Sequence, residues 1–218
     1  SGLCRHRFID AHLLEALPDL DQVLILGAGY DSRAYRFARA LDRRPVFEVD
    51  LAPLSRRKKQ IVADNPAVFD RGNVTSVEID FRTQSLDSQL TGSGFRPGTP
   101  TFVVWEGVSM YLTREAVIDT LGALVALCGR GSVLAMDFWQ TVRGVGPYDQ
   151  LRRAGQRAMG LIGEPIGFSI APSRVGELFE PAGFDVVDLA TADKMTARYA
   201  TAGRRCDEGM YVAAARLR

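Results

Sequence analysis

Val23-Leu-Ile-Leu-Gly-Ala-Gly-Tyr-Asp-Ser-Arg-Ala-Tyr-Arg36 carries the strongest structural signal in this sequence. Its first four residues are a continuous apolar run, which is typical of a strand buried on both faces of a parallel sheet. The run ends in Gly27-Ala28-Gly29, and glycine tolerates tight turns and lets a ligand approach the backbone closely. Apolar residues over 34–41 then recur at helical spacing. The segment predicts a strand, a glycine turn and a helix capped by Asp31 or Ser32.

The alternation of strand and helix continues along the chain. Apolar runs predict further strands at 46–49, 74–79, 102–105, 133–136, 186–189 and 211–215. Strands that alternate with helices indicate right-handed crossovers and a sheet that is covered on both faces. We expect no helix between the last two strands, so the final strand should run antiparallel. The prediction is an α/β fold with a doubly wound, Rossmann-like sheet that is mostly parallel.

Length and apolar content indicate how the chain is divided. With 218 residues and 46% hydrophobic residues, the chain suits one globular domain over 1–218. An amphipathic pattern predicts an N-terminal helix within 1–20. Residues 142–170 fit no core element and are interpreted as a lid over the substrate, with a structural cap as the alternative.

Charge and composition narrow the classes of function. Lys and Arg number 27 against 26 Asp and Glu, a formal net charge of +1, whereas nucleic acids and membrane surfaces favour clustered basic charge. The short basic run 56–59 is interpreted as a solvated helix face. The three cysteines form no C-x-x-C pair, which argues against a disulfide framework. The two histidines lack ligand partners, which argues against a metal site. With no run long enough to span a membrane, we expect a cytoplasmic protein that acts on a small molecule.

Acidic side chains follow the predicted strands, at the edge where open parallel sheets bind ligands. Asp50 ends the second strand, where an acidic residue can accept hydrogen bonds from the ribose hydroxyls of an adenosine, or cap the next helix. Asp80, after the third strand, could accept from the adenine amine while Phe81 packs on the ring; a solvated loop acid is the alternative. Glu106 and Gly107 follow the fourth strand, where a glycine removes bulk and a glutamate can offset positive ligand charge.

Other candidates come from the first helix and from the segment after the fourth strand. Arg5 could grip a carboxylate through two hydrogen bonds. Tyr111 is the candidate catalytic residue that would line an acceptor pocket, and its alternative is an ordinary core aromatic. His6 or His12 could act as a general base, although a surface position is expected for both.

Three segments together resemble the leucine carboxyl methyltransferase-like family of class I S-adenosylmethionine (SAM) methyltransferases, which includes polyketide carboxyl O-methyltransferases. They are the stretch 23–36, Phe47-Glu-Val-Asp50 and Trp105-Glu-Gly-Val-Ser-Met-Tyr-Leu112. Family members usually carry a long helical segment before the arginine that corresponds to Arg5. The resemblance implies SAM as the cofactor and a role for each matching residue. It assigns the SAM carboxylate to Arg5, the methionine moiety to Gly27 and Gly29, the loop shape to Asp31 and Arg33, the ribose to Asp50, the adenine to Asp80 and Phe81, and the amino-acid end to Glu106.

The expected activity is methyl transfer from SAM to an oxygen of a small molecule. A carboxylate acceptor is ionised at neutral pH and needs no general base, which suits a chain with two histidines, whereas a phenol or alcohol would need one. Carboxyl methylation is therefore favoured, with phenolic or alcoholic O-methylation next. Two alternatives stay open: an NAD(P)-dependent oxidoreductase, disfavoured because Ser32 stands where a third glycine is wanted, and a SAM-binding protein without catalysis.

Overall fold

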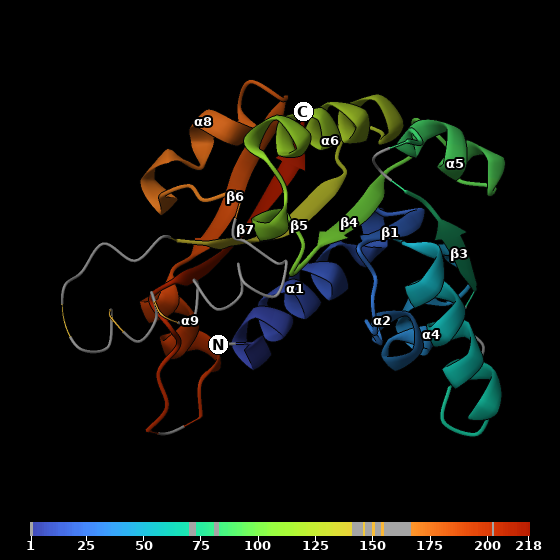
Figure 1. Cartoon of the computed structure of the whole chain (residues 1–218), viewed down its shortest axis with the longest axis horizontal. Helices are drawn as coiled ribbons and strands as arrows, with labels where there is room; N and C mark the ends of the chain where they lie inside the picture. Colours follow the sequence, from blue (N-terminus) through green and yellow to red (C-terminus); the bar gives the residue numbers. More distant parts are fainter. Residues whose placement is uncertain are drawn as a thin grey trace.

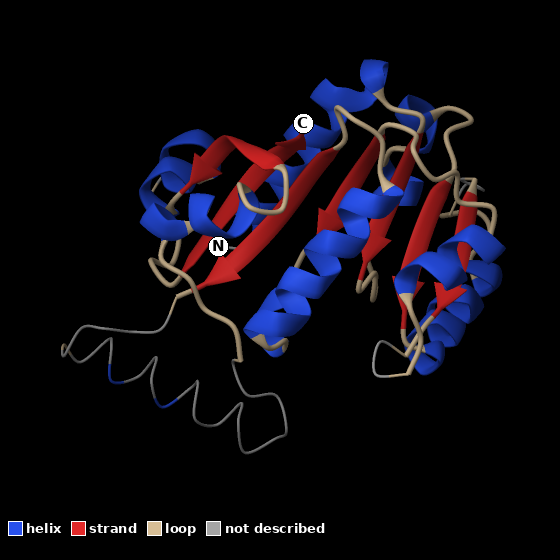
Figure 2. Cartoon of the chain, turned by 90° about the horizontal axis from the view of Figure 1, so that it is seen from above, coloured by secondary structure: helices blue, strands red, loops and turns tan. Residues whose placement is uncertain are grey.

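The computed structural model describes residues 2–69, 73–80, 83–140, 146, 150, 154, 167–201 and 203–218. Within these residues, seven strands form one sheet in the order β3-β2-β1-β4-β5-β7-β6, with helices on both sides (Figures 1 and 2). The strands are β1 (Gln22–Leu26), β2 (Val46–Asp50), β3 (Val74–Glu78), β4 (Thr101–Trp105), β5 (Val133–Trp139), β6 (Phe184–Ala190) and β7 (Met210–Leu217).

The sheet is doubly wound around β1. That strand pairs in parallel with β2 on one side and with β4 on the other. β3 and β5 extend the parallel part outward, and β7 runs antiparallel between β5 and β6. The gap between β1 and β4 is thus the point where the order of the strands reverses, which is where such sheets bind ligands. The predicted Rossmann-like fold with an antiparallel last strand is confirmed.

One expectation about the last two strands is wrong. A helix, α9 (Ala192–Tyr199), connects β6 to β7. It has eight residues and buries only Ala192 and Met195 within its span, so its apolar signal in the sequence is short. β7 is antiparallel because it enters the sheet between β5 and β6 from the opposite end, not because the connection lacks a helix.

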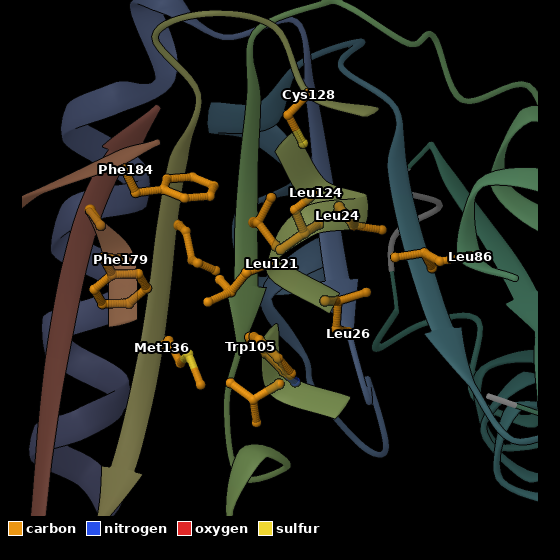
Figure 3. Packing of buried hydrophobic residues seen from close by; sticks show 14 of the residues in the cluster. Leu24, Leu26, Leu86, Trp105, Leu121, Leu124, Cys128, Met136, Phe179 and Phe184 are labelled. Carbon is orange, nitrogen blue, oxygen red and sulfur yellow. The ribbon is translucent and has the colours of Figure 1, made fainter. Parts of the chain in front are cut away.

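The helices divide between two apolar clusters, one on each face of the sheet. α1 (Gly2–Ala16), α2 (Arg33–Arg36), α3 (Ala38–Leu41) and α9 share one cluster. α5 (Leu86–Gly92), α6 (Arg114–Leu127) and α8 (Gly176–Phe179) share the other. In Figure 3, Leu24, Leu26, Trp105 and Met136 lie along neighbouring strands on the second face, next to Leu121 and Leu124 of α6. The described residues also form short 3-10 turns: η1 (Leu17–Asp19), η2 (Ser109–Tyr111) and η3 (Pro172–Arg174).

The helix predicted over 34–41 is present as two short helices, α2 and α3, separated at Phe37. Ser32 takes the N-cap position without a side-chain hydrogen bond. Asp31 supplies that bond instead, because its Oδ1 accepts from the Arg33 backbone N–H at 2.7 Å. Of the two capping candidates, Asp31 is therefore the one whose side chain serves the helix start.

The basic run 56–59 is only partly a solvated face, which corrects the sequence interpretation. It lies on α4 (Ala52–Asp64), where Lys58 is buried and its Nζ lies 2.8 Å from Oε2 of Glu48 on β2. Burial raises the pKa of Glu48 above its ordinary value of 4.5, although Lys58 acts in the opposite direction. Lys58 thus neutralises a carboxylate inside the protein, a role that charge patterning alone does not reveal.

Two further expectations, the lid over 142–170 and the lack of a membrane-spanning run, can be compared only with the described residues. Most of the proposed lid, 142–170, lies outside them, so that interpretation stays a prediction. At its end, Phe168 and Ile170 are buried in the cluster under α6 and α8. Within the described ranges, the helices are all too short or too polar to cross a lipid bilayer.

Replacing Lys58 by Met should lower the free energy of unfolding by about 3–5 kcal/mol at pH 7, because Glu48 would be left buried without a counter-ion. The loss should shrink as the pH falls through the raised pKa of folded Glu48 toward the ordinary value of 4.5, because a protonated Glu48 needs no counter-ion. Urea unfolding at several pH values measures both effects. Lys59→Met is the matched control: Lys59 is 53% exposed and pairs with Glu78 on the surface, so a change within about 0.5 kcal/mol is expected. Equal effects of both variants would contradict this role for Lys58.

Candidate functional site

A pocket of about 580 Å³ opens at the carboxyl end of β1, beside the point where the strand order reverses. We call it the glycine-turn pocket. Its walls are the turn 27–29, the start of α2, the first turns of α1 and the residue after β4. A volume of this size is typical of sites for small organic ligands.

The glycine turn has a shape that other residues could not adopt. Gly27 and Gly29 have φ angles of +62° and +41°, in the region that favours glycine. A Cβ built on Gly27 would also overlap the Cγ2 atom of Val108, which follows β4. The turn is therefore closely packed against the β4 loop, and side chains are kept away from the pocket floor.

Asp50 links the end of β2 to the glycine turn. Its Oδ2 accepts from the Gly29 backbone N–H at 2.6 Å, and its Oδ1 accepts from the Leu51 backbone N–H at 2.7 Å. Leu51, not Asp50, occupies the N-cap position of α4, so the alternative interpretation of Asp50 as the helix cap is wrong. The carboxylate lies 21 residues beyond Gly29 in sequence yet touches it in space.

Arg5 reaches from α1 to two carboxylates at the ends of β4 and β5. Its Nε donates to Oε1 of Glu106 at 2.5 Å and its Nη1 donates to Oδ2 of Asp137 at 2.7 Å. The other oxygen of Asp137 accepts from the Gly107 backbone N–H at 2.7 Å. Burial raises the pKa of Asp137, although Arg5 acts against it. Among the described residues these contacts do not use Nη2 of Arg5, which lies on the side where a Cβ of Gly107 would be 3.8 Å away.

Arg33 holds the opposite side of the same carboxylate. It is 2% exposed, and its Nη1 lies 2.7 Å from Oε2 of Glu106. It also pairs with Asp31 and, through Nε at 2.7 Å, with Asp10 on α1. Burial works to lower the pKa of Arg33, but its three carboxylate partners raise it above the ordinary value.

Glu106 is the shared partner of these cations. Burial alone would raise its pKa, but a hydrogen bond from His6 and the charges of Arg33 and Arg5 lower the pKa of Glu106 to about 2. The carboxylate is therefore ionised throughout the range in which the protein is expected to fold. A permanent negative charge at the pocket wall can offset positive charge on a ligand.

His6 is exposed, as expected, and its ring also contacts the site. Its Nδ1 lies 2.8 Å from Oε1 of Glu106 and 3.2 Å from Nη2 of Arg33. Because a carboxylate only accepts and a guanidinium only donates, the shorter contact puts the proton on Nδ1. Nε2 is then the acceptor nitrogen, and the side chain is 46% exposed at the pocket wall. His12, by contrast, contacts Asp188 near β6.

The remaining candidates are distributed differently. Asp80 follows β3, where its backbone N–H donates to the Gln84 side chain at 2.9 Å, and Phe81 lies outside the described residues. Tyr111 ends η2, is 42% exposed, and does not line the glycine-turn pocket.

A second pocket of about 310 Å³ lies between α5 and α6 and shares Leu26 and Gly27 with the first. We call it the apolar pocket, since Trp105, Val108, Leu112 and Leu86 help to line it.

Sequence reasoning named His6 only as a possible general base, and it missed Asp10 and Asp137 as members of the site. Asp137 directly follows the strand predicted at 133–136, and an acid at a strand end is the same signal that marks Asp50 and Glu106. Asp10 and His6 are on α1, whose position against the sheet is a tertiary property. The residue types at 5–9 do not indicate which side of α1 faces the pocket.

Replacing Glu106 by Gln should lower the free energy of unfolding by about 3 kcal/mol at neutral pH, because two buried arginines lose their shared counter-charge. The ionised glutamate contributes stability that is complete above its ordinary pKa of 4.5 and is lost as the pH falls from 4.5 toward 2. The difference between wild type and variant should therefore narrow over that range in denaturant titrations. Glu177→Gln, at an exposed pair with Arg174, serves as the control and should leave the free energy of unfolding nearly unchanged. A pH-independent difference would refute the ionic role of Glu106.

Comparison with known structures bears on the fold. A DUF574 family protein from Streptomyces avermitilis superposes with a TM-score of 0.70 at 17% identity, covering 99% of this chain and 83% of that chain. The magnesium protoporphyrin IX methyltransferase of Synechocystis PCC 6803, solved with bound SAH, superposes with a TM-score of 0.62 at 16% identity, covering 97% and 81%. At such identities the likeness supports the shared sheet architecture.

Sequence relatives give the family. A putative S-adenosyl-L-methionine-dependent methyltransferase of Parafrankia sp. is 34% identical over 134 residues, and one of Mycobacterium marinum is 36% identical over 134 residues. Each alignment covers 61% of this chain and 42% of the relative, so the chain spans less than half of the length of these relatives. The sequence profile of the leucine carboxyl methyltransferase family matches residues 1–125. The chain belongs to the leucine carboxyl methyltransferase family.

Proposed function

We propose that this chain is a SAM-dependent methyltransferase that methylates an oxygen of a small molecule. The observation that carries the proposal is the convergence of Arg5, Arg33 and Glu106 on the glycine-turn pocket, with Asp50 at the end of β2. Family membership supports the same activity. The alternatives, an NAD(P)-dependent oxidoreductase and a non-catalytic SAM-binding protein, are outcomes of the binding and activity tests below.

The residues of the glycine-turn pocket fit SAM in charge. The amino-acid end of SAM carries a carboxylate and an ammonium group, and its sulfur is positively charged. Nη2 of Arg5 is suited to the carboxylate, while Glu106 supplies negative charge for the ammonium group. Asp10 and Asp31 add further negative charge along the same wall. The arginines and carboxylates of this wall therefore offer partners for both the carboxylate and the positively charged groups of SAM.

The nucleoside part has candidate partners on the other side of the glycine turn. Asp50 lies at the strand end where an acid can accept from ribose hydroxyls. The apolar pocket, with Trp105 and Val108 in its lining, suits a flat aromatic ring such as adenine. Because the two pockets share Leu26 and Gly27, one elongated ligand could occupy both. Asp80 and Phe81 remain predictions for the adenine, as the family resemblance implies.

When bound, SAM supplies a methyl group on a positively charged sulfur. The chain then has to orient the acceptor and exclude water rather than create a strong nucleophile. A carboxylate acceptor, with an unperturbed pKa near about 4, arrives ionised. We therefore favour a carboxylic acid as the acceptor. The second candidate is a hydroxyl acceptor, favoured by one observation: Glu106 orients His6 so that Nε2 could accept a proton.

Asp50→Ala should weaken binding of S-adenosylhomocysteine by about 1.5–3 kcal/mol, the range for a hydrogen bond to a charged group. Calorimetry measures this, with NADH as the rival ligand. The control is Asp64→Ala at the end of α4, whose side chain accepts from Gln60 away from the pocket. Unchanged affinity in Asp50→Ala would count against the ribose assignment. Binding of NADH instead would favour the oxidoreductase.

The acceptor class can be tested through the histidines. If the acceptor is a carboxylate, His6→Ala should keep its turnover, and the pH–rate profile should lack a limb near about 6.5. His12→Ala is the matched control because His12 contacts Asp188 instead of Glu106. The assay uses a panel of carboxylic acids and phenols, with mass spectrometry of the products to distinguish methyl esters from ethers.

A loss of turnover of about 100-fold or more in His6→Ala alone, at intact affinity for S-adenosylhomocysteine, would overturn the carboxylate proposal. His6 would then be the general base for a hydroxyl acceptor. Binding of S-adenosylhomocysteine without turnover on any member of the panel would favour the non-catalytic alternative.

A further inference from the structure

Two cysteines line the same pocket beside the first turn of α1. Cys4 lies on α1 and Cys206 on the segment before β7, and both are 7% exposed. They belong to the same apolar cluster and line one small pocket of about 240 Å³. Burial, together with a hydrogen bond to the Cys206 thiol, raises the pKa of Cys4. We call these two residues the thiol pair.

The backbone on both sides of the thiol pair is held in place. The Cys206 backbone N–H donates to Oγ1 of Thr196 on α9 at 2.9 Å. On the α1 side, Nη1 of Arg7 donates to the Tyr199 carbonyl at the end of α9, also at 2.9 Å. α9 thus ties the first turn of α1 and the segment before β7 to the same support. The backbone beside both cysteines is therefore held by contacts that do not involve sulfur.

Cys128 provides the contrast within the same chain. It is 6% exposed, so its burial matches that of the thiol pair, but it lies in the cluster on the other face of the sheet. Burial raises the pKa of Cys128 to about 12, with Thr101 as its side-chain partner. Burial is therefore common to all three cysteines, and the opposed second thiol distinguishes Cys4 and Cys206.

We propose that the thiol pair is an oxidation site at which hydrogen peroxide forms a disulfide between Cys4 and Cys206. The sulfur of one thiol attacks the peroxide, the O–O bond breaks, and the thiol proton passes to the leaving hydroxide, so that a sulfenic acid and one water form. The second thiol attacks the sulfenic sulfur, the S–S bond forms, and a second water leaves. The two cysteines lose two electrons and two protons in total, and the peroxide is reduced to two waters.

The disulfide would act directly beside the glycine-turn pocket. Arg5 follows Cys4 in the sequence and joins α1 to Glu106 and Asp137. A covalent bond at Cys4 would fasten the turn that carries Arg5 to the segment leading into β7. The oxidation site does not depend on the proposed methyl transfer, since it requires only the fold of the described residues.

Peptide mapping of the full 218-residue chain tests the proposal. The reduced protein is treated with hydrogen peroxide, alkylated and digested with trypsin. We expect peptide 1–5 to be covalently joined to peptide 206–216 and to separate on reduction, while peptide 115–130, which holds Cys128, stays alkylated. Cys206→Ser should abolish the link and leave Cys4 as a sulfenic acid that dimedone traps, and Cys4→Ser should abolish the link as well.

The control is Cys128→Ser, which should form the 1–5 to 206–216 link to the same extent as the wild type. The proposal is overturned if the link is absent from the oxidised wild type, if Cys4 and Cys206 are each oxidised without joining, or if the joined peptides come only from chains cross-linked to one another. Because the wild-type map needs no substitution, failure of a serine variant to fold would not affect the result.

Discussion

The Glu106 carboxylate binds side chains of both α1 and α2, and the geometry of the site depends on this shared carboxylate. Arg5 and His6 approach its Oε1 atom from α1, and Arg33 approaches Oε2 from α2. Since Glu106 directly follows β4 at the centre of the sheet, it fixes two helices against the strand end. Without it, two largely buried guanidinium groups would face each other across the pocket wall without their common counter-ion.

The cost of burying these charges explains why the network extends beyond three residues. A buried ion pair is tolerated when its remaining hydrogen-bonding groups are also satisfied. Asp137 and the Gly107 N–H complete the arrangement around Arg5, and Asp10 and Asp31 complete it around Arg33. The lining of the glycine-turn pocket thus holds the carboxylates of Asp10, Asp31 and Glu106 beside the guanidinium groups of Arg5, Arg7, Arg33 and Arg36. It therefore offers partners both for a carboxylate and for a positively charged group of a ligand.

The family match covers 1–125 and therefore contains Arg5, Arg33, Asp50 and Glu106. Asp137 lies beyond it, on β5, yet it holds one prong of Arg5. β7 and α9 are also outside the match, and they pack against α1 through the cluster that includes Cys206. The second half of the chain thus supports the candidate cofactor site by positioning α1, the helix that supplies Arg5.

Local signals in the sequence were sufficient for the sheet, the glycine turn and the acids at the strand ends. A strand buried on both faces requires a continuous apolar run, and a turn with positive φ requires glycine, so both leave a direct record in the residue types. Asp50 could be predicted because its position relative to the strand end determines where its carboxylate lies. Other features depend on residues that are distant in sequence and have no local signature. They are the ion pair of Lys58 with Glu48, the contact of His6 with Glu106, the reach of Arg5 to Asp137, and the meeting of Cys4 with Cys206. Each of these pairs is brought together by packing of a helix or loop against the sheet, because only the folded arrangement removes both groups from water and brings them into contact.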